Sequence, residues 1–272
     1  MELDREDQAI LRIVGNVCAE IETPWMLVGA LARDLLLVRL AGVTAGRATN
    51  DVDIAVLVES WQAYSMVKLR LIDTGHFEAT GQAQRLVGPR GGDLAGRQLD
   101  IVPFGRVATA DAVLRWPPDA DVVMSVAGFN EAFLSSVEMN VGDGLAVRVV
   151  SAAGLALLKV NAWRERRHDT RKDALDFVRL LLSYQHVVGV DRLYDDIDLL
   201  ERCGFNVERS AAWLLGADMR AVALPSTLEL ILEAFEGGFY ADIENIADTS
   251  RDLATLYRDC QDGLRGQTPT AE

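Results

Sequence analysis

The sequence predicts an α/β (α+β) protein, with a small mixed sheet in an N-terminal domain followed by an all-helical C-terminal domain. Short apolar runs at residues 25–28, 51–58 and 99–104 have the length of strands and lie among helix-like segments. Beyond Ser151 the apolar residues recur at helical spacing instead. We therefore expect domains at 1–150 and 151–265, and a flexible tail at 266–272.

The first half of the chain is expected to alternate between helices and strands. Apolar residues at helical spacing predict a first helix, and Pro24 separates it from the first strand. Ser60 is suited to cap a later helix that Gly75 ends. The predicted helices are 4–21, 31–40 and 61–73, and the predicted strands are 25–28, 51–58, 77–80, 84–87, 99–104, 122–126, 136–139 and 145–149.

The second half is expected to hold helices only. Ala174, Phe177, Val178, Leu181 and Leu182 lie on one face of a predicted helix. The segment Ser226-Thr227-Leu228-Glu229 has the pattern of a capping box, and Gly237-Gly238 follows at the end of the helix that it would begin.

Bulk properties exclude several classes of protein. No run in the 272 residues approaches the roughly 20 apolar residues of a membrane span, and the charged start lacks the apolar core of a signal peptide. The three cysteines are widely spaced and fit reduced thiols. We expect a cytoplasmic protein with no membrane partner.

The net charge of −14 disfavours indiscriminate nucleic-acid binding, which depends on neutralising phosphates. Residues 159–173 are the local exception, with six basic and three acidic side chains. Lys159, Trp163 and Arg166 would share one face of a helix there. Such a segment could dock one RNA end, although a solvated charged helix would have the same composition.

Three aspartates are the main candidates for chemistry. Side chains alternate along a strand, so Asp51 and Asp53 point to the same face, and Asp100 on a neighbouring strand could complete the cluster. Like charges so close repel unless a cation lies between them. An oxygen-only site of this kind suits Mg²⁺ or Mn²⁺.

The turn Gly29-Ala30 is the second candidate. It joins a strand to a helix, and backbone N–H groups at the start of that helix could hold a triphosphate. The alternative is a plain strand-to-helix turn. Arg33, one turn into the helix, could pair either with phosphates or with Asp34.

Three segments in this order resemble the DNA polymerase β-like nucleotidyltransferases. They are Gly29-Ala30, Arg47-Ala48-Thr49-Asn50-Asp51-Val52-Asp53-Ile54, and Asp100-Ile101-Val102-Pro103-Phe104-Gly105. The later Leu158–Arg164 and Lys172–Asp176 resemble the second half of one branch of that superfamily. Within that superfamily the chain resembles the AbiEii/AbiGii branch, the nucleotidyltransferase toxins of type IV toxin–antitoxin and phage-defence systems. The resemblance covers roughly residues 20–185.

The resemblance implies an enzyme that moves NMP from an NTP (ATP, GTP or CTP) to an acceptor hydroxyl and releases pyrophosphate. In the toxin branch the acceptor is RNA, such as a tRNA 3′ end, and a cognate antitoxin is a partner. The implied metal ligands are Asp51, Asp53 and Asp100, with Mg²⁺ or Mn²⁺ as cofactor. The implied nucleotide-binding residues are Gly29, Ala30, Arg33, Arg47, Thr49 and Lys159.

The same resemblance implies that Asp173 acts in catalysis or positions Lys159, with Asp176 one turn away as the alternate. Ala30 departs from the Gly-Gly or Gly-Ser of the superfamily and lacks a hydroxyl for a phosphate. Two other functions stay open. One is an aminoglycoside-type small-molecule nucleotidyltransferase, which an acidic surface would suit. The other is a non-catalytic, antitoxin-like nucleotide-binding partner.

Overall fold

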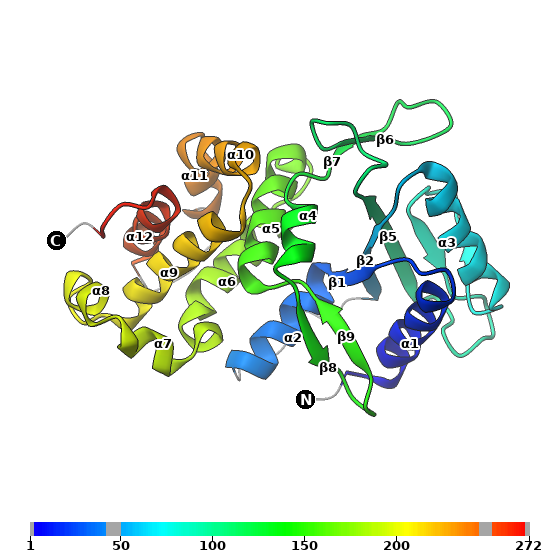
Figure 1. Cartoon of the computed structure of the whole chain (residues 1–272), viewed down its shortest axis with the longest axis horizontal. Helices are drawn as coiled ribbons and strands as arrows, with labels where there is room; N and C mark the ends of the chain where they lie inside the picture. Colours follow the sequence, from blue (N-terminus) through cyan, green and yellow to red (C-terminus); the bar gives the residue numbers. More distant parts are fainter. Residues whose placement is uncertain (1–2, 42–49, 245–251, 270–272) are drawn as a thin grey trace. The chain divides into compact units, whose positions relative to one another are not determined.

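The computed structural model describes residues 3–41, 50–244 and 252–269 (Figure 1). The chain divides into two compact units. Unit 1 comprises Met1–Ala32 and Gly46–Val150, and unit 2 comprises Arg33–Ala45 and Ser151–Glu272. Among the predicted site residues, Arg47 and Thr49 lie outside the described residues, as do residues 270–272 of the predicted tail.

Unit 1 is built on a seven-stranded mixed sheet, counted over the described residues, with the order β3-β4-β5-β2-β1-β9-β8. Its strands are β1 (Trp25–Val28), β2 (Asp51–Leu57), β3 (Glu78–Ala79), β4 (Arg85–Val87), β5 (Gln98–Phe104), β8 (Val137–Asn140) and β9 (Ala146–Val149). The two central strands β2 and β5 run parallel, whereas β1 and β4 pair antiparallel on either side of them. A separate two-stranded sheet joins β6 (Val113–Arg115) to β7 (Val123–Ser125).

The central strand β2 is buried along its apolar half, as its continuous apolar sequence predicts. Ile54, Ala55 and Val56 have no exposed surface. A strand buried on both faces requires cover on both sides, so β2 is fixed in the middle of the unit. Its first residues, Asp51 and Asp53, are only partly buried and lie where the strand begins.

The predicted helices of unit 1 begin and end close to where the sequence places them. They are α1 (Arg5–Glu20), the start of α2 (Gly29–Ala41) and α3 (Trp61–Asp73), and the unit also holds α4 (Phe129–Leu134). The Ser60 side chain accepts a hydrogen bond from the Ala63 N–H at 3.2 Å, which confirms the predicted cap of α3. Gly75 follows with a φ of +77°, the conformation that ends helices and favours glycine.

Unit 2 is helical throughout its described part, and together with the mixed sheet this confirms the predicted fold class. Its helices after Ser151 are α5 (Ala152–Arg166), α6 (Lys172–Val188), α7 (Val190–Asp195), α8 (Ile197–Arg202), α9 (Val207–Val222), α10 (Pro225–Glu236), α11 (Phe239–Glu244) and α12 (Leu253–Arg265). Aromatic rings of α6, α10 and α11 form its core, with Phe177 and Phe239 fully buried. None of the described helices is long and apolar enough to cross a membrane.

Two glycines let α9 and α12 approach each other closely. A Cβ atom on Gly216 would lie 1.9 Å from the Cys260 carbonyl oxygen, and one on Gly263 would lie 2.0 Å from that of Trp213. Because backbone cannot yield as a flexible side chain does, any larger residue would force these helices apart.

The predicted capping box is wrong. Helix α10 starts at Pro225, and Leu224 occupies the N-cap position without a side-chain hydrogen bond. Proline is favoured at the first helical position, because its fixed φ is helical and its missing N–H would have no intrahelical partner there. Ser226 therefore lies inside the first turn. Strand β6 and helix α4 are short elements that the periodicity analysis did not predict.

Candidate active site

One row of residues crosses four strands of the unit 1 sheet. Asp53 on β2 lies opposite Asp100 on the parallel strand β5 and opposite Val28 on the antiparallel strand β1. Arg85 on β4 lies opposite Asp100 on its other side. Residues directly opposite each other in a ladder point to the same face, so this row presents Arg85, Asp100 and Asp53 side by side.

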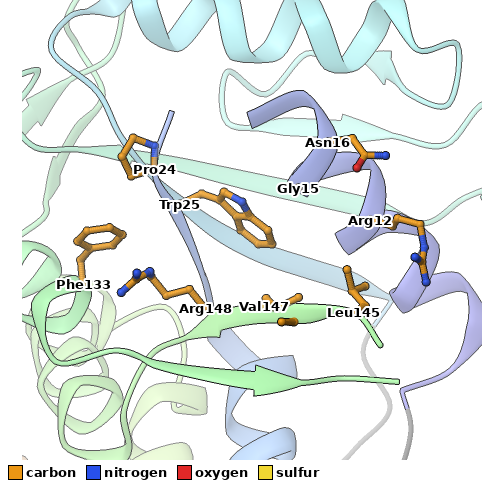
Figure 2. Close-up of a pocket in the computed structure, with 10 residues that line it drawn as sticks. Arg12, Gly15, Asn16, Pro24, Trp25, Phe133, Leu145, Val147 and Arg148 are labelled. Atoms are coloured by element: carbon orange, nitrogen blue, oxygen red, sulfur yellow. The ribbon is translucent and has the colours of Figure 1, made fainter. Parts of the chain in front are cut away.

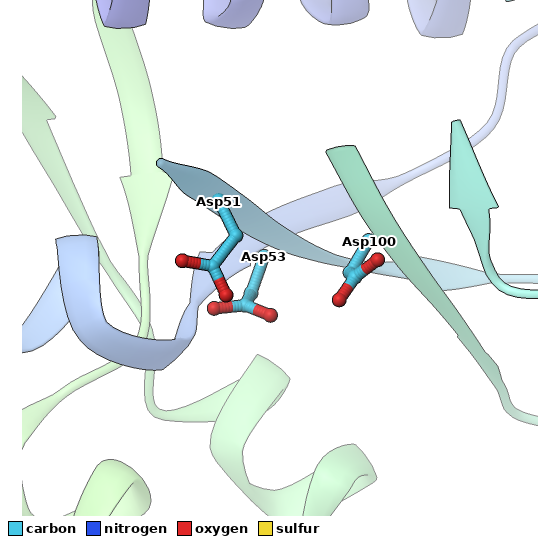
Figure 3. A group of neighbouring side chains, drawn as sticks. All are labelled: Asp51, Asp53 and Asp100. Carbon is cyan, nitrogen blue, oxygen red and sulfur yellow. The ribbon is translucent and has the colours of Figure 1, made fainter. Parts of the chain in front are cut away.

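Asp51 joins this row from two residues earlier on β2, which places it on the same face. One carboxylate oxygen from each of Asp51, Asp53 and Asp100 lies within 4.8 Å of the other two (Figure 3). All three side chains are partly buried. The structure thus brings together the three carboxylates that the alternation pattern predicts.

The Gly29 turn packs directly against this cluster. A Cβ atom on Gly29 would lie 2.0 Å from Oδ2 of Asp53, and its φ is +71°. Both the space and the backbone conformation therefore require glycine here. Helix α2 begins at Gly29 itself, so Ala30 lies in its first turn, where backbone N–H groups have no intrahelical acceptor.

Arg85 is the site residue that the sequence analysis missed. Its Nε donates to Oδ1 of Asp100 at 2.7 Å and its Nη2 donates to Oδ2 at 2.6 Å. This hydrogen-bonded pair, with the charges of Asp51 and Asp53 nearby, raises the pKa of Arg85 above its ordinary value despite partial burial. One feature of the sequence could have indicated this residue: Arg85 is a basic residue in the predicted strand 84–87, which directly precedes the predicted strand of Asp100.

The hairpin that carries Arg85 is anchored independently of that ion pair. The Tyr64 hydroxyl lies 3.1 Å from the Ile101 carbonyl oxygen and 3.2 Å from that of Ala83, and it can donate to either. The Ile101 N–H also donates to the Gln84 carbonyl at 2.8 Å. Burial, with the charge of Asp100, raises the pKa of the Tyr64 hydroxyl, so it stays a neutral donor.

The donor set fits a hard divalent cation. Three carboxylates supply oxygen ligands only, with no histidine or cysteine in the cluster. The three carboxylates repel one another, and Arg85 offsets only part of this repulsion. A bound cation would reduce it further. The residues present therefore fit Mg²⁺ or Mn²⁺.

In unit 2 the predicted residues Lys159 and Asp173 belong to a buried ionic network. The Lys159 ammonium lies 2.7 Å from Oδ2 of Asp176 and 3.4 Å from Oδ1 of Asp173. Asp173 also accepts two hydrogen bonds from Arg166, at 2.8 and 3.0 Å. Lys159 is thus held more closely by Asp176, the predicted alternate, than by Asp173.

Arg33 completes this network from helix α2. It pairs with Asp34, the alternative that the sequence left open, at 2.7 Å, and also with Asp176. Its side chain is 4% exposed. The indole N–H of Trp163 donates to Asp242 at 2.8 Å, and the side chain is buried in the core, so it is not accessible for stacking with a nucleotide base.

A separate cavity of about 450 Å³ lies in unit 1, beside α1, β1, β9 and α4 (Figure 2). The Trp25 indole lies there with the guanidinium groups of Arg12 and Arg148 on either side. Arg148 stacks over the Phe133 ring at 5.0 Å and donates to Ser136 at 3.1 Å. The lining holds no carboxylate, so this cavity is distinct from the aspartate cluster.

No protein-family model matches the chain, and no curated protein matches it. Among solved structures, it is similar to an antigenic nucleotidyltransferase-like protein from Paracoccidioides brasiliensis, with 16% identity and a TM-score of 0.44 over 66% of this chain and 77% of that one. It is also similar to the antibiotic-resistance factor ANT(2″)-Ia, with 15% identity and a TM-score of 0.41 over 89% and 97%.

A CCA-adding enzyme in complex with CTP matches 96% of this chain and 71% of its own, with 15% identity and a TM-score of 0.29. At such low identities and TM-scores, similarity carries no inference about activity. That inference has to come from the residues of the site.

Proposed function

We propose that this protein is a metal-dependent nucleotidyltransferase of the polymerase β-like kind. The observation that supports the proposal is the row of carboxylates on adjacent strands, with one oxygen from each of Asp51, Asp53 and Asp100 within 4.8 Å of the others. Phosphoryl-type transfer depends on positioning and charge neutralisation more than on covalent help from protein. A rigid sheet that presents three carboxylates at one place meets that requirement.

Asp51, Asp53 and Asp100 would hold Mg²⁺ or Mn²⁺. When bound, such ions neutralise charge on the triphosphate and stabilise the attacking and leaving oxygens. Gly29 contributes by leaving room for Asp53. Asp100 would also accept a hydrogen bond from the attacking hydroxyl and so orient its lone pair towards phosphorus.

The proposed reaction is a single displacement at the α-phosphorus of an NTP. The acceptor hydroxyl oxygen forms the new P–O bond, the bond to the bridging α–β oxygen breaks, and pyrophosphate leaves. The hydroxyl proton is lost to water. The acceptor receives NMP through a phosphodiester bond.

Lys159 is the proposed contact for the triphosphate. It belongs to a network of described residues in which Arg33, Lys159, Arg166 and Arg179 face Asp34, Asp173 and Asp176. Guanidinium and ammonium groups gathered in this way are the side chains that bind phosphate oxygens. Asp176, at 2.7 Å, would position the Lys159 ammonium.

We propose RNA as the acceptor. The cavity with Arg12, Trp25 and Arg148 combines two guanidinium groups with an aromatic face, the side-chain types that bind single-stranded RNA. Among the described residues, neither arginine forms an ion pair with a carboxylate. In the predicted segment 159–173, Arg164 and Arg166 are engaged in ion pairs and are less available to RNA.

A toxin role and an antitoxin partner find no support in the comparisons and stay predictions from the sequence. An aminoglycoside acceptor is the competing function, since the net charge of −14 would attract cations. The two acceptors predict opposite effects of charge changes at the cavity. Reversing Arg12 and Arg148 to glutamate should impair transfer to RNA, whereas a cationic acceptor would be unaffected or better bound.

The function is tested by incubating the protein with Mg²⁺, α-³²P-labelled NTPs, and either total RNA or an aminoglycoside panel. Wild type should label RNA, and Asp53→Asn should not. Asp93→Asn is the matched control, because Asp93 is an exposed carboxylate of the same unit outside the cluster. Label on an aminoglycoside alone would exclude the RNA acceptor, and no label on any acceptor would contradict the nucleotidyltransferase assignment.

A further inference from the structure

Arg85 binds both carboxylate oxygens of Asp100, one of the three proposed metal ligands. The pair is part of the sheet itself, because Arg85 and Asp100 lie opposite each other in the β4–β5 ladder. The side chains of Arg85 and Asp100 are 27% and 14% exposed. The Arg85–Asp100 ion pair is therefore held in place by the sheet and is partly shielded from water, unlike an ion pair between two exposed surface side chains.

The geometry leaves Asp100 able to bind a cation as well. An ionised carboxylate has about four lone-pair positions. The two hydrogen bonds from Arg85, at 2.7 and 2.6 Å, use one position on each oxygen. Two further positions remain, and one Asp100 oxygen lies within 4.8 Å of an oxygen of Asp51 and of Asp53, so Arg85 and a cation can share this carboxylate.

Arg85 does not serve chiefly to hold the hairpin. The Thr80 hydroxyl donates to the Arg85 carbonyl at 3.1 Å, and the Arg85 N–H donates to the Gln82 carbonyl at 3.1 Å. With the bonds from Tyr64 and Ile101, these backbone contacts already fix the strand. What the side chain adds is a positive charge that cannot be lost by deprotonation.

The positive charge of Arg85 affects the three aspartates of the cluster to different extents. It is in hydrogen-bond contact with Asp100 and acts on Asp51 and Asp53 only through space. Arg85 would therefore repel a cation bound through Asp100 more than it would repel one bound between Asp51 and Asp53. A triphosphate carries enough negative charge to offset that repulsion.

We propose that Arg85 is a positioning residue that weakens the cation position at Asp100 until nucleotide is bound. The Arg85 side chain keeps the Asp100 carboxylate in the position needed to bind a metal ion in the presence of nucleotide. At the same time, its positive charge lowers the affinity of Asp100 for a divalent ion. An ion at the Asp100 position would then bind only together with the triphosphate, so the free protein would not hold every ion of the complete metal centre. This inference rests on the proposed function, because it assumes that the aspartates bind divalent ions.

The test is a Mn²⁺ titration of the full-length protein without nucleotide, with free Mn²⁺ measured by electron paramagnetic resonance. The variants are Arg85→Gln, which removes the charge, and Arg85→Lys, which keeps it. Arg106→Gln is the matched control. Arg106 pairs with Glu59 at 3.0 Å, is 82% exposed and lies in the same unit, so its loss changes the net charge equally.

Arg85→Gln should bind Mn²⁺ at least tenfold more tightly than wild type, or bind one additional ion. Arg85→Lys and Arg106→Gln should stay within about threefold of wild type. Adding a non-hydrolysable NTP analogue should reduce the difference between wild type and Arg85→Gln, because the triphosphate then supplies the compensating charge. Melting temperatures identify any variant that fails to fold; if Arg85→Gln does, Arg85→Met, which also removes the charge, takes its place in the comparison with wild type.

Two results would overturn the proposal. Mn²⁺ affinity of Arg85→Gln equal to that of Arg106→Gln would show that the charge does not act on the site, and weaker binding would show that Arg85 supports metal binding. Failure of the proposed function looks different. In that case neither wild type nor Arg85→Gln binds Mn²⁺, or Asp53→Asn binds as many Mn²⁺ ions as wild type. Either result would contradict both the proposed function and the role inferred for Arg85.

Discussion

Replacing Asp53 by asparagine should stabilise the metal-free protein and abolish its stabilisation by divalent cations. Oxygens of Asp51, Asp53 and Asp100 lie within 4.8 Å of one another. Two unit charges at that distance repel by about 0.9 kcal/mol in water and about 3.5 kcal/mol at an effective dielectric of 20. Asparagine has nearly the same shape as aspartate, so the packing against Gly29 is kept.

The expected gain follows from counting the interactions that change. Neutralising Asp53 removes its repulsion with Asp51 and with Asp100, and it also removes its attraction to Arg85. Of these three interactions, about one repulsion remains as the net gain. Because the groups are partly exposed, we expect the unfolding free energy in chelator to rise by about 1–3 kcal/mol.

The assay is thermal unfolding in EDTA and in Mn²⁺. For a chain of this size, 1 kcal/mol corresponds to roughly 2–4 °C in melting temperature. Wild type should melt at a higher temperature in Mn²⁺ than in EDTA, and Asp53→Asn should not. A variant that is less stable than wild type in EDTA and still gains stability from Mn²⁺ would refute the electrostatic reasoning. Asp93→Asn should behave as wild type in both buffers.

Three further changes test the surrounding structure. Gly29→Ala should lower the unfolding free energy in urea by about 2–4 kcal/mol, because its Cβ would lie 2.0 Å from Oδ2 of Asp53 at a positive φ; a loss below about 1 kcal/mol would contradict this. Burial raises the pKa of Asp7 from 3.8 to about 6, so the stability of wild type relative to Asp7→Asn should fall by about 3 kcal/mol from pH 3.5 to pH 7, and a pH-independent difference would contradict it. Lys159→Met should weaken NTP binding in calorimetry by about 1.5–3 kcal/mol, and unchanged affinity would leave this lysine a purely structural partner of Asp176.

The aspartate cluster could be predicted from the sequence because its signal is local. Side chains alternate along a strand, so Asp51 and Asp53 share one face wherever the strand lies. Asp100 joins them because its strand β5 is the neighbour of β2. The same holds for α3, whose cap Ser60 and terminal Gly75 act within one turn of the helix.

The missed features depend on contacts between distant segments. Arg85 belongs to a three-residue strand, and its position opposite Asp100 is set by the register of the hairpin, which no periodicity reveals. Arg33 and Asp176 are 143 residues apart in the sequence. The start of α10 was misplaced because proline at the first position and a Ser-x-x-Glu pattern compete as start signals.

Anomalous diffraction from crystals soaked with Mn²⁺ and a non-hydrolysable NTP analogue tests the central claim most directly. Mn²⁺ should appear within about 2.0–2.2 Å of carboxylate oxygens of Asp51, Asp53 and Asp100, with the triphosphate bound to the same ions. An Asp53→Asn crystal under the same conditions should lose those peaks. Anomalous peaks that avoid the three carboxylates, or that persist unchanged in Asp53→Asn, would contradict the assignment of this cluster as the metal centre of a nucleotidyltransferase.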